Sequence, residues 1–164
     1  MRRTLNVLGL LVLICVTQLV PARGDFQAGV EAYNRGDYVA ALNELMPLAE
    51  AGDAEAQALV GLMYKIGGGL PQDFAEAAKW LRRSAEQGES GAQGILGMMY
   101  VKAEGVPRDL VKAHLCFNVA GAQGQEDGFS ARDAVEQMMS QDEITRARRM
   151  ASECAEKDYK GCKF

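Results

Sequence analysis

A nine-residue segment recurs almost unchanged 36 positions further along the chain, and this repetition limits the fold more than any other feature of the sequence. Residues 56–64 read AQALVGLMY and residues 92–100 read AQGILGMMY. A repeat of this length is one supersecondary unit, which buries its apolar side only by stacking against neighbouring units. The sequence therefore predicts an array of stacked units, a class that usually presents an extended surface to a partner. Identical residues also recur at the same spacing outside this segment, at Pro71/Pro107, Asp73/Asp109, Ala77/Ala113, Gln87/Gln123 and Gly88/Gly124.

Apolar residues after Asp25 recur at helical spacing, and no strand-like alternation stands out. Asp37, Asp53, Asp73 and Ser140 stand where N-caps are expected. We therefore predict an all-α fold, an α/α solenoid of tandem helix-turn-helix repeats with a C-terminal capping helix pair. The expected helices cover 25–35, 38–51, 54–65, 74–87, 90–102, 109–123, 130–139 and 141–156. They group into units over about 25–52, 53–88 and 89–124, with the cap at 125–164.

Two details of the repeat carry packing information. Gly61 and its echo Gly97 lie in mid-helix, where glycine costs up to ~1 kcal/mol relative to alanine. Their shared position predicts a close approach between helices that a side chain would prevent. The first unit is also shorter, because the second and third units carry a five-residue insertion in the loop between their helices.

The first 24 residues have the pattern of a signal peptide. Arg2 and Arg3 precede an apolar run over 5–20, and small residues around Ala22 and Gly24 supply a cleavage site. We expect cleavage after Gly24 or Ala22, a periplasmic or secreted location, and no membrane insertion after cleavage. A retained membrane anchor is a weaker alternative because the run is short for a spanning helix. A lipoprotein site at Cys15 is weaker still.

The charge of the processed chain argues against nucleic acid as a partner. Removing Arg2, Arg3 and Arg23 from the 18 basic residues leaves 15 against 22 acidic residues, a net charge of −7. Such a chain repels phosphate backbones, and no basic stripe offsets the repulsion. We expect a monomer that binds a protein or peptide partner.

Cysteine spacing indicates one crosslink. Cys154 and Cys162 lie close together, and in an exported protein the simplest interpretation is a disulfide. A redox or metal pair ranks lower, since the spacing is not C-x-x-C and no histidine is near. Cys116 lies inside an expected helix, where the previous repeat has Trp80, and is expected to be a buried free thiol.

The second unit carries the pattern A-x-A-Q-x-x-x-G-x-M-Y…G-G-x-P-x-D-F-x-x-A-x-x-W…A-E-Q-G from Ala54 to Gly88. This pattern resembles a Sel1-like repeat, a relative of the tetratricopeptide repeat with a longer, glycine-bearing loop. The third unit resembles the same family but departs from it at Cys116, Ala103 and Glu104. The resemblance implies an α/α solenoid with a concave face that serves as a scaffold or adaptor. Exported members are frequent in Gram-negative bacteria.

The residues offer little for catalysis. His114 is the single histidine and is expected to be a surface or partly buried structural residue. No second histidine or cysteine pattern supports a metal site, and no serine has an activating histidine motif. We therefore expect no catalytic residues, no metal and no cofactor, and we interpret the chain as a non-enzyme.

The first helix of each Sel1-like unit offers a candidate binding surface. With Ala56, Val60, Gly61 and Tyr64 facing inward, Leu59 and Leu62 face the other side. They and their echoes form an apolar stripe suited to an apolar partner segment. An equally weighted alternative is that the first or the C-terminal helices cover these positions. The candidate partner-binding residues are Leu59, Leu62, Lys65, Ile95, Met98 and Lys102.

Sequence alone leaves the function at the level of a class. The leading hypothesis is an exported scaffold or adaptor that holds a protein or peptide. A periplasmic regulator that inhibits a membrane sensor is a special case of this hypothesis. A cell-envelope hydrolase is the alternative from a different class, and the lack of a nucleophile–base pair argues against it.

Overall fold

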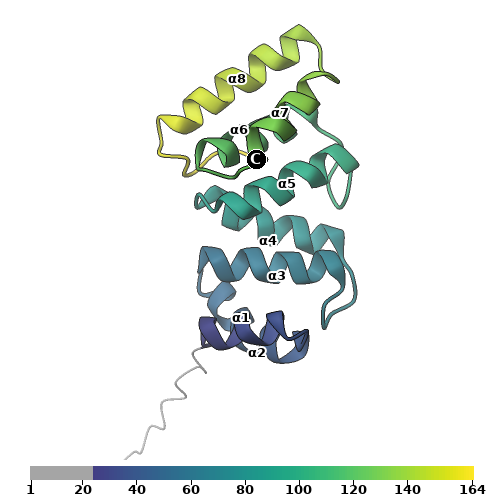
Figure 1. The fold of residues 1–164 in the computed structure, drawn as a ribbon, viewed down its shortest axis with the longest axis vertical. Coiled ribbons are helices and arrows are strands. Elements are labelled where there is room, and N and C mark those ends of the chain that lie inside the picture. The colour runs from purple at the N-terminus through teal and green to yellow at the C-terminus, as the bar shows by residue number, and fades with distance from the viewer. Residues whose placement is uncertain (1–23) are drawn as a thin grey trace, which may run out of the picture.

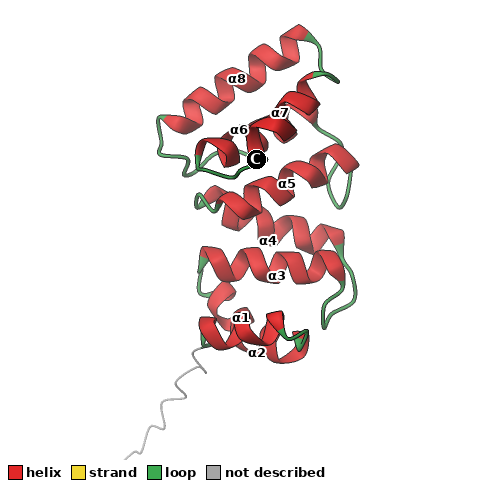
Figure 2. Cartoon of the chain, viewed as in Figure 1, coloured by secondary structure: helices red, strands yellow, loops and turns green. Residues whose placement is uncertain are grey.

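The computed structural model describes residues 24–164, and within this range the secondary structure consists of eight helices and no strands (Figures 1 and 2). The predicted signal peptide lies outside the described residues, apart from Gly24. The helices are α1 (Phe26–Asn34), α2 (Tyr38–Glu50), α3 (Ala54–Ile66), α4 (Phe74–Glu86), α5 (Ser90–Lys102), α6 (Leu110–Ala122), α7 (Gly128–Glu136) and α8 (Gln141–Ala155).

The helices form an elongated stack in which chain order is also spatial order. From α1 to α7, each helix packs on the next one along the chain. Figure 1 shows α1 and α2 at one end and α8 at the other. The α/α solenoid predicted from the repeat is therefore confirmed. The spacing of the repeat sets this arrangement, since each unit buries its apolar side against its neighbours.

Polar caps fix most helix starts where the sequence predicted them. The side chains of Asp37, Asp53 and Asp73 accept hydrogen bonds from backbone N–H groups in the first turns of α2, α3 and α4. Ser140 and Glu143 form a reciprocal capping box at the start of α8. The cap of α5 is Glu89, which accepts from the N–H groups of Gly91 and Ala92 and was not predicted.

The two mid-helix glycines lie where neighbouring helices touch, as predicted. A Cβ atom on Gly61 would lie 2.8 Å from Cγ of Leu81 on α4. One on Gly97 would lie 2.8 Å from Cε1 of Phe117 on α6. Each glycine lowers the stability of its own helix, and its missing side chain allows the two helices of the unit to pack closely.

The five-residue loop insertion of the second and third units has a structural role. Gly69 lies in the loop of the second unit at φ +71°, and a Cβ there would come within 2.9 Å of the Tyr38 carbonyl carbon. Gly105 occupies the same place in the third unit at φ +67° and packs directly on the Phe74 carbonyl. Each long loop thus covers the first residue of the second helix in the preceding unit. The first unit has no preceding unit to cover, and its loop is short.

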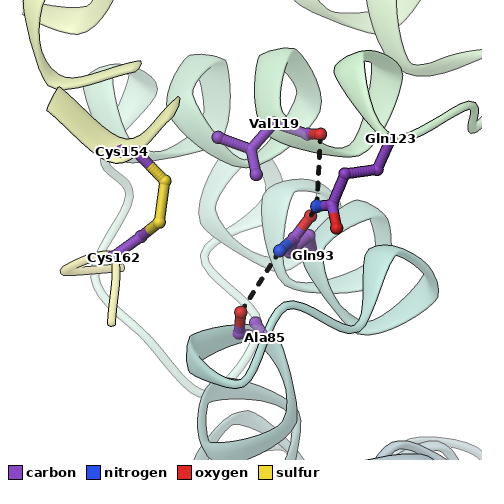
Figure 3. The surroundings of a disulfide bond; sticks show 6 residues. All are labelled: Ala85, Gln93, Val119, Gln123, Cys154 and Cys162. Carbon is purple, nitrogen blue, oxygen red and sulfur yellow. Dashed lines mark hydrogen bonds between the residues drawn. A yellow bond between two sulfur atoms is a disulfide. The ribbon is translucent and has the colours of Figure 1, made fainter. Parts of the chain in front are cut away.

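Glutamines tie consecutive helices together from within (Figure 3). The Gln57 amide on α3 donates to the Ala49 carbonyl of α2 at 3.0 Å. Its echo Gln93 on α5 donates to the Ala85 carbonyl of α4 at 3.2 Å, and it is fully buried. Burial of these amides is tolerated because each finds a hydrogen-bond partner. The glutamine of the A-x-A-Q pattern is therefore a link between units.

The apolar core is divided along the stack into two clusters. One cluster is built from α1, α2 and α3, and includes Leu45 and Val60. The other extends from α4 to the C-terminus and includes Leu81 and Phe117. Tyr64 packs against both clusters and connects them. The core is thus a continuous strip through the stack, which is the expected organisation of a solenoid.

The C-terminal cap differs in detail from the expectation. α7 runs from Gly128 to Glu136 and not from 130 to 139, because Gly128 sits directly against Gly121 of α6, where only glycine fits. α8 makes its main contact with α6. Both capping helices therefore cover the same last repeat helix, which buries its side chains almost completely.

Candidate functional site

A groove of about 330 Å³ opens on the N-terminal half of the stack, between α1, α3 and the start of α5. Three of the predicted partner-binding residues, Leu59, Leu62 and Ile95, line it. All three side chains are only partly buried. The remaining lining residues are Phe26, Glu55, Ala58, Glu89 and Gly91.

The 36-residue repeat explains why these side chains meet. Leu59 on α3 and Ile95 on α5 are equivalent positions of successive units, so stacking places them on the same side of neighbouring first helices. Leu62 lies one turn further along α3, on the same face as Leu59. Phe26, near the start of α1, extends the apolar lining towards the first unit.

The first helix thus only borders the groove, although the sequence left open that it covers the stripe. Leu59 and Ile95 pack against the two core clusters with part of their surface. Leu62 belongs to neither cluster. The groove therefore combines residues that also support the fold with one leucine that does not.

Within the described part of the chain, the ionisable residues that line the groove are both acidic. Glu55 lies in the first turn of α3 and is exposed. Glu89 caps α5, where its carboxylate accepts backbone hydrogen bonds from Gly91, at 3.0 Å, and from Ala92. A groove with an apolar floor and two carboxylates attracts cationic groups and repels anionic ones.

The other predicted partner-binding residues lie outside this lining. Lys65, at the end of α3, forms an ion pair with Glu104 of the next loop, with Nζ 3.3 Å from Oε2. Lys102 is exposed at the end of α5, and Met98 is 39% exposed on the same helix. The structure therefore groups three of the six residues in one groove and leaves three apart from it.

Sequence reasoning missed Phe26, Glu55 and Glu89 as parts of the groove. Glu89 follows Gly88, the residue that ends the preceding helix, and this position could have identified it as both cap and rim. No pattern in the sequence could have shown that the start of α1 borders the groove and leaves it open.

His114 is fully buried, which corrects the expectation of a surface or partly buried residue. Its Nε2 lies 2.7 Å from Oε1 of Glu136 on α7, and Arg148 of α8 binds the same carboxylate. Hydrogen bonds from Arg148 and His114 lower the pKa of Glu136. The group links the last repeat helix, α6, to the two capping helices, and this structural role explains why the histidine lies inside.

The cysteines occupy two different environments. Cys154 of α8 and Cys162 of the C-terminal segment form a disulfide with a Cα–Cα distance of 5.4 Å (Figure 3). The segment returns to the second unit, where the Gly161 N–H donates to the Glu86 carbonyl at 2.6 Å. Cys116 is buried and unpaired, as predicted, and burial raises the pKa of its thiol well above the usual range.

Residues 24–164 hold no group of three or more histidine, cysteine or acidic residues arranged to bind a metal ion. In the same range, no helix has both the length and the apolar character that crossing a bilayer requires.

These observations define the class of the protein. It is an all-α solenoid of stacked helix-turn-helix repeats, a scaffold that is typically a non-enzymatic module for protein interaction. The repeats themselves belong to a known family: residues 54–89 and 90–125 are two tandem Sel1 repeats. The resemblance predicted from the sequence is therefore confirmed.

Solved structures with the same fold include two bacterial proteins. One is a protective antigen of uropathogenic Escherichia coli with an SLR fold, with a TM-score of 0.75 and 28% identity. It matches over 82% of this chain and 29% of its own. The other is a Sel1 repeat protein from Oxalobacter formigenes, with a TM-score of 0.59, 30% identity, and coverage of 62% and 41%. This chain thus spans less than half of either protein. A search of curated protein sequences returned no match.

Proposed function

We propose that this protein is an exported, non-enzymatic interaction module that holds a partner protein or peptide in the groove between α1, α3 and α5. The observation that carries the proposal is the meeting of Leu59, Leu62 and Ile95 in one groove of about 330 Å³. Folding leaves part of each side chain accessible, although burial of such side chains is favourable. Apolar residues that line an open groove on a folded protein are typical of a binding surface.

Export is supported by two independent features. The basic and apolar segment over 2–20 has the composition of a signal peptide. Cys154 and Cys162 form a disulfide, and such bonds persist mainly in oxidising compartments such as the periplasm and the exterior. The mass of the protein isolated from its host tests both features. We expect loss of the first 22 to 24 residues and of two hydrogens, and an intact N-terminus would contradict export.

Binding in the groove can be tested by site-specific photo-crosslinking in the producing cell. We would place a photoreactive amino acid at position 62 and, as a control, at Met138, an exposed apolar residue on the cap. Leu62 suits this purpose because it belongs to neither core cluster. We expect one discrete adduct from position 62 and none of that mass from position 138. Identical adducts from both positions, or none from position 62, would contradict the proposal.

Enzymatic activity is the alternative that biochemical assays can address directly. His114 of α6 forms a cluster of ionisable groups with Glu136 of α7 and Arg148 of α8. Its histidine is fully buried and holds helices together, so a substrate has no path to it. We therefore assign this cluster a structural role and not a catalytic one. Hydrolysis of cell-wall material by the purified protein, abolished by His114→Asn, would overturn the assignment.

A further inference from the structure

The shape and charge of the groove indicate the chemistry of its partner, which the function proposed above leaves open. Three properties characterise a groove that binds polypeptides: the shape of its floor, the sign of the charges at its rim, and how closely the backbone of the partner can approach. All three are defined by residues of α1, of α3 and of α5 with its N-cap in this structure.

The floor fits large apolar side chains. Phe26, Leu59, Leu62 and Ile95 surround a volume of about 330 Å³, at the lower end of the roughly 300–1,000 Å³ that ligand pockets occupy. A groove of this size takes one or two bulky side chains and leaves the remainder of a partner outside. Anchors of this kind typically dominate the affinity of an interface.

The rim selects for positive charge. Glu55 is exposed, and Glu89 carries its charge beside the groove while it caps α5. Among residues 24–164, no lysine or arginine lines the groove, and Lys65, one of the two predicted binding lysines, is paired with Glu104. An acidic partner would therefore be repelled at the rim, while a lysine or arginine beside the apolar anchor would be attracted.

One position on α5, next to the groove residue Ile95, lacks a side chain without any packing reason inside the described fold. Gly94 lies in the middle of α5 next to Ile95, and a Cβ placed on it would meet no atom within 4 Å. Its equivalent in the second unit is Ala58, which lines the groove. Unlike Gly61 and Gly97, this glycine is not explained by helix packing. A bare backbone at such a place allows close approach of another chain.

From these three observations, we propose that the groove binds a polypeptide segment that presents a large apolar side chain next to a lysine or arginine. The backbone of the segment passes over Gly91 and Gly94. This proposal rests on the proposed function and specifies the chemistry of the partner. The supporting arguments are charge complementarity at Glu55 and Glu89 and the unexplained open backbone at Gly94.

Three end-capped ten-residue peptides test the chemistry directly. The first contains two leucines flanked by lysines, the second has glutamates in place of the lysines, and the third has serines in place of the leucines. Binding to the purified protein is measured by fluorescence anisotropy at low and at moderate salt. We expect the first peptide to bind at least about tenfold more tightly than either other peptide, and to weaken as salt rises. Equal binding of the lysine and glutamate peptides would overturn the proposal.

Variants localise the binding to the groove. We expect Glu55→Lys and Leu62→Ser each to weaken the first peptide about tenfold or more. The matched controls are Asp142→Lys, which reverses an exposed first-turn acid on α8, and Met138→Ser, which removes an exposed apolar side chain. Both controls should bind as the unchanged protein does. Loss of binding in the controls, or no loss in the groove variants, would overturn the proposal.

Gly94→Leu gives a readout that a purely structural role would not produce. Because helix propensity favours leucine and the site is open, we expect the variant to unfold at higher temperature. The same change should weaken the lysine–leucine peptide by about tenfold, since the new side chain occupies the path of the backbone. Higher stability with unchanged binding would contradict the assigned path.

Two results would separate this proposal from the proposed function. If crosslinking from position 62 yields a partner but the peptides show no preference for lysine, the groove binds a partner of different chemistry. If neither experiment gives a signal that depends on the groove, both proposals fail. Sedimentation of the protein alone, with Leu62→Ser as control, identifies a second copy as the occupant, and self-association through the groove would also overturn the proposal.

Discussion

Gln87 donates a hydrogen bond from its side-chain amide to the amide oxygen of Gln57 at 2.8 Å, and Gln123 makes the same bond to Gln93 at 2.7 Å one repeat later. Each pair joins the end of the second helix to the start of the first helix within one unit. Gln57 and Gln93 in turn donate to carbonyl groups of the preceding unit. The repeated glutamines thus form a chain of hydrogen bonds along the stack, in which the side-chain amide of each glutamine has a partner.

Breaking the ladder at its most buried member should destabilise the protein. Gln93→Met keeps the volume of the side chain but leaves the Gln123 amide and the Ala85 carbonyl without this partner. We expect a loss of about 1–3 kcal/mol in the free energy of unfolding, measured by urea denaturation. Gln125→Met serves as control, because among the described residues the Gln125 side chain bonds only to Ser90, at the surface. A control loss as large as that of Gln93→Met would contradict the importance of burial.

Substitution of Gly105 tests the docking of long loops on the preceding unit. The residue has φ +67° and lies directly on the Phe74 carbonyl, so alanine faces both backbone strain and a backbone clash. We expect Gly105→Ala to cost at least about 2 kcal/mol. Gly124→Ala has a positive φ without any neighbour within 4 Å, and should cost about 1 kcal/mol. Equal thermal stabilities of the two variants would show that the loop does not press on Phe74.

Ala103 offers an opportunity to stabilise the protein. It ends α5 in the left-handed conformation at φ 58°, whereas the equivalent residue of the second unit is Gly67. Relief of about 1–2 kcal/mol of strain exceeds the entropic cost of a glycine in the unfolded chain. We therefore expect Ala103→Gly to gain about 0.5–1 kcal/mol by urea denaturation. Ala134→Gly, at an exposed helical position, should lose about as much, and a loss in both variants would contradict the strain.

The disulfide should stabilise the cap. Cys154 and Cys162 close a short loop whose far end docks through Gly161 on Glu86, and Phe164 is buried beside it. Replacing both cysteines with serine should cost about 2–3 kcal/mol on the chain-entropy account. A reductant should lower the melting temperature of the unchanged protein and leave the double variant unaffected. Insensitivity of the unchanged protein would show that the bond is absent or unimportant.

Stability should depend on pH through Glu136. Its pKa is lowered in the folded state by Arg148 and His114, so its contribution is present above the unfolded pKa of about 4.3 and is lost as pH falls through the folded pKa. The unchanged protein should therefore lose stability on acidification below about pH 4.3. Glu136→Gln should show a weaker dependence in this range, measured by thermal melts between pH 3 and about 6. Parallel pH curves for the two proteins would contradict the coupling.

The sequence predicted the structure of the repeated units better than the structure of the cap. The fold class, most helix boundaries and the role of Gly61 and Gly97 could be predicted, because local patterns and a shared register specify them. The prediction failed for the start of α7 and for the burial of His114. The start of α7 lies in the cap, where no second copy exists for comparison. His114 lies on α6, where the packing of α7 and α8 buries it.

The candidate groove was predictable only in part. The repeat places Leu59 and Ile95 at equivalent positions, so their shared face follows from the sequence. The pairing of Lys65 with Glu104 does not follow from it, because this contact depends on how the next loop folds back. The same holds for Phe26, since only the packing of α1 on α2 decides where its side chain lies.

By itself, the sequence determined that this protein is a stack of helical units, because periodic apolar positions, caps and glycines act over short distances along the chain. The tertiary structure decided which faces remain open and which charges border them. These properties depend on packing between residues far apart in sequence, as in the groove of Phe26, Leu62 and Ile95 with its rim of Glu55 and Glu89.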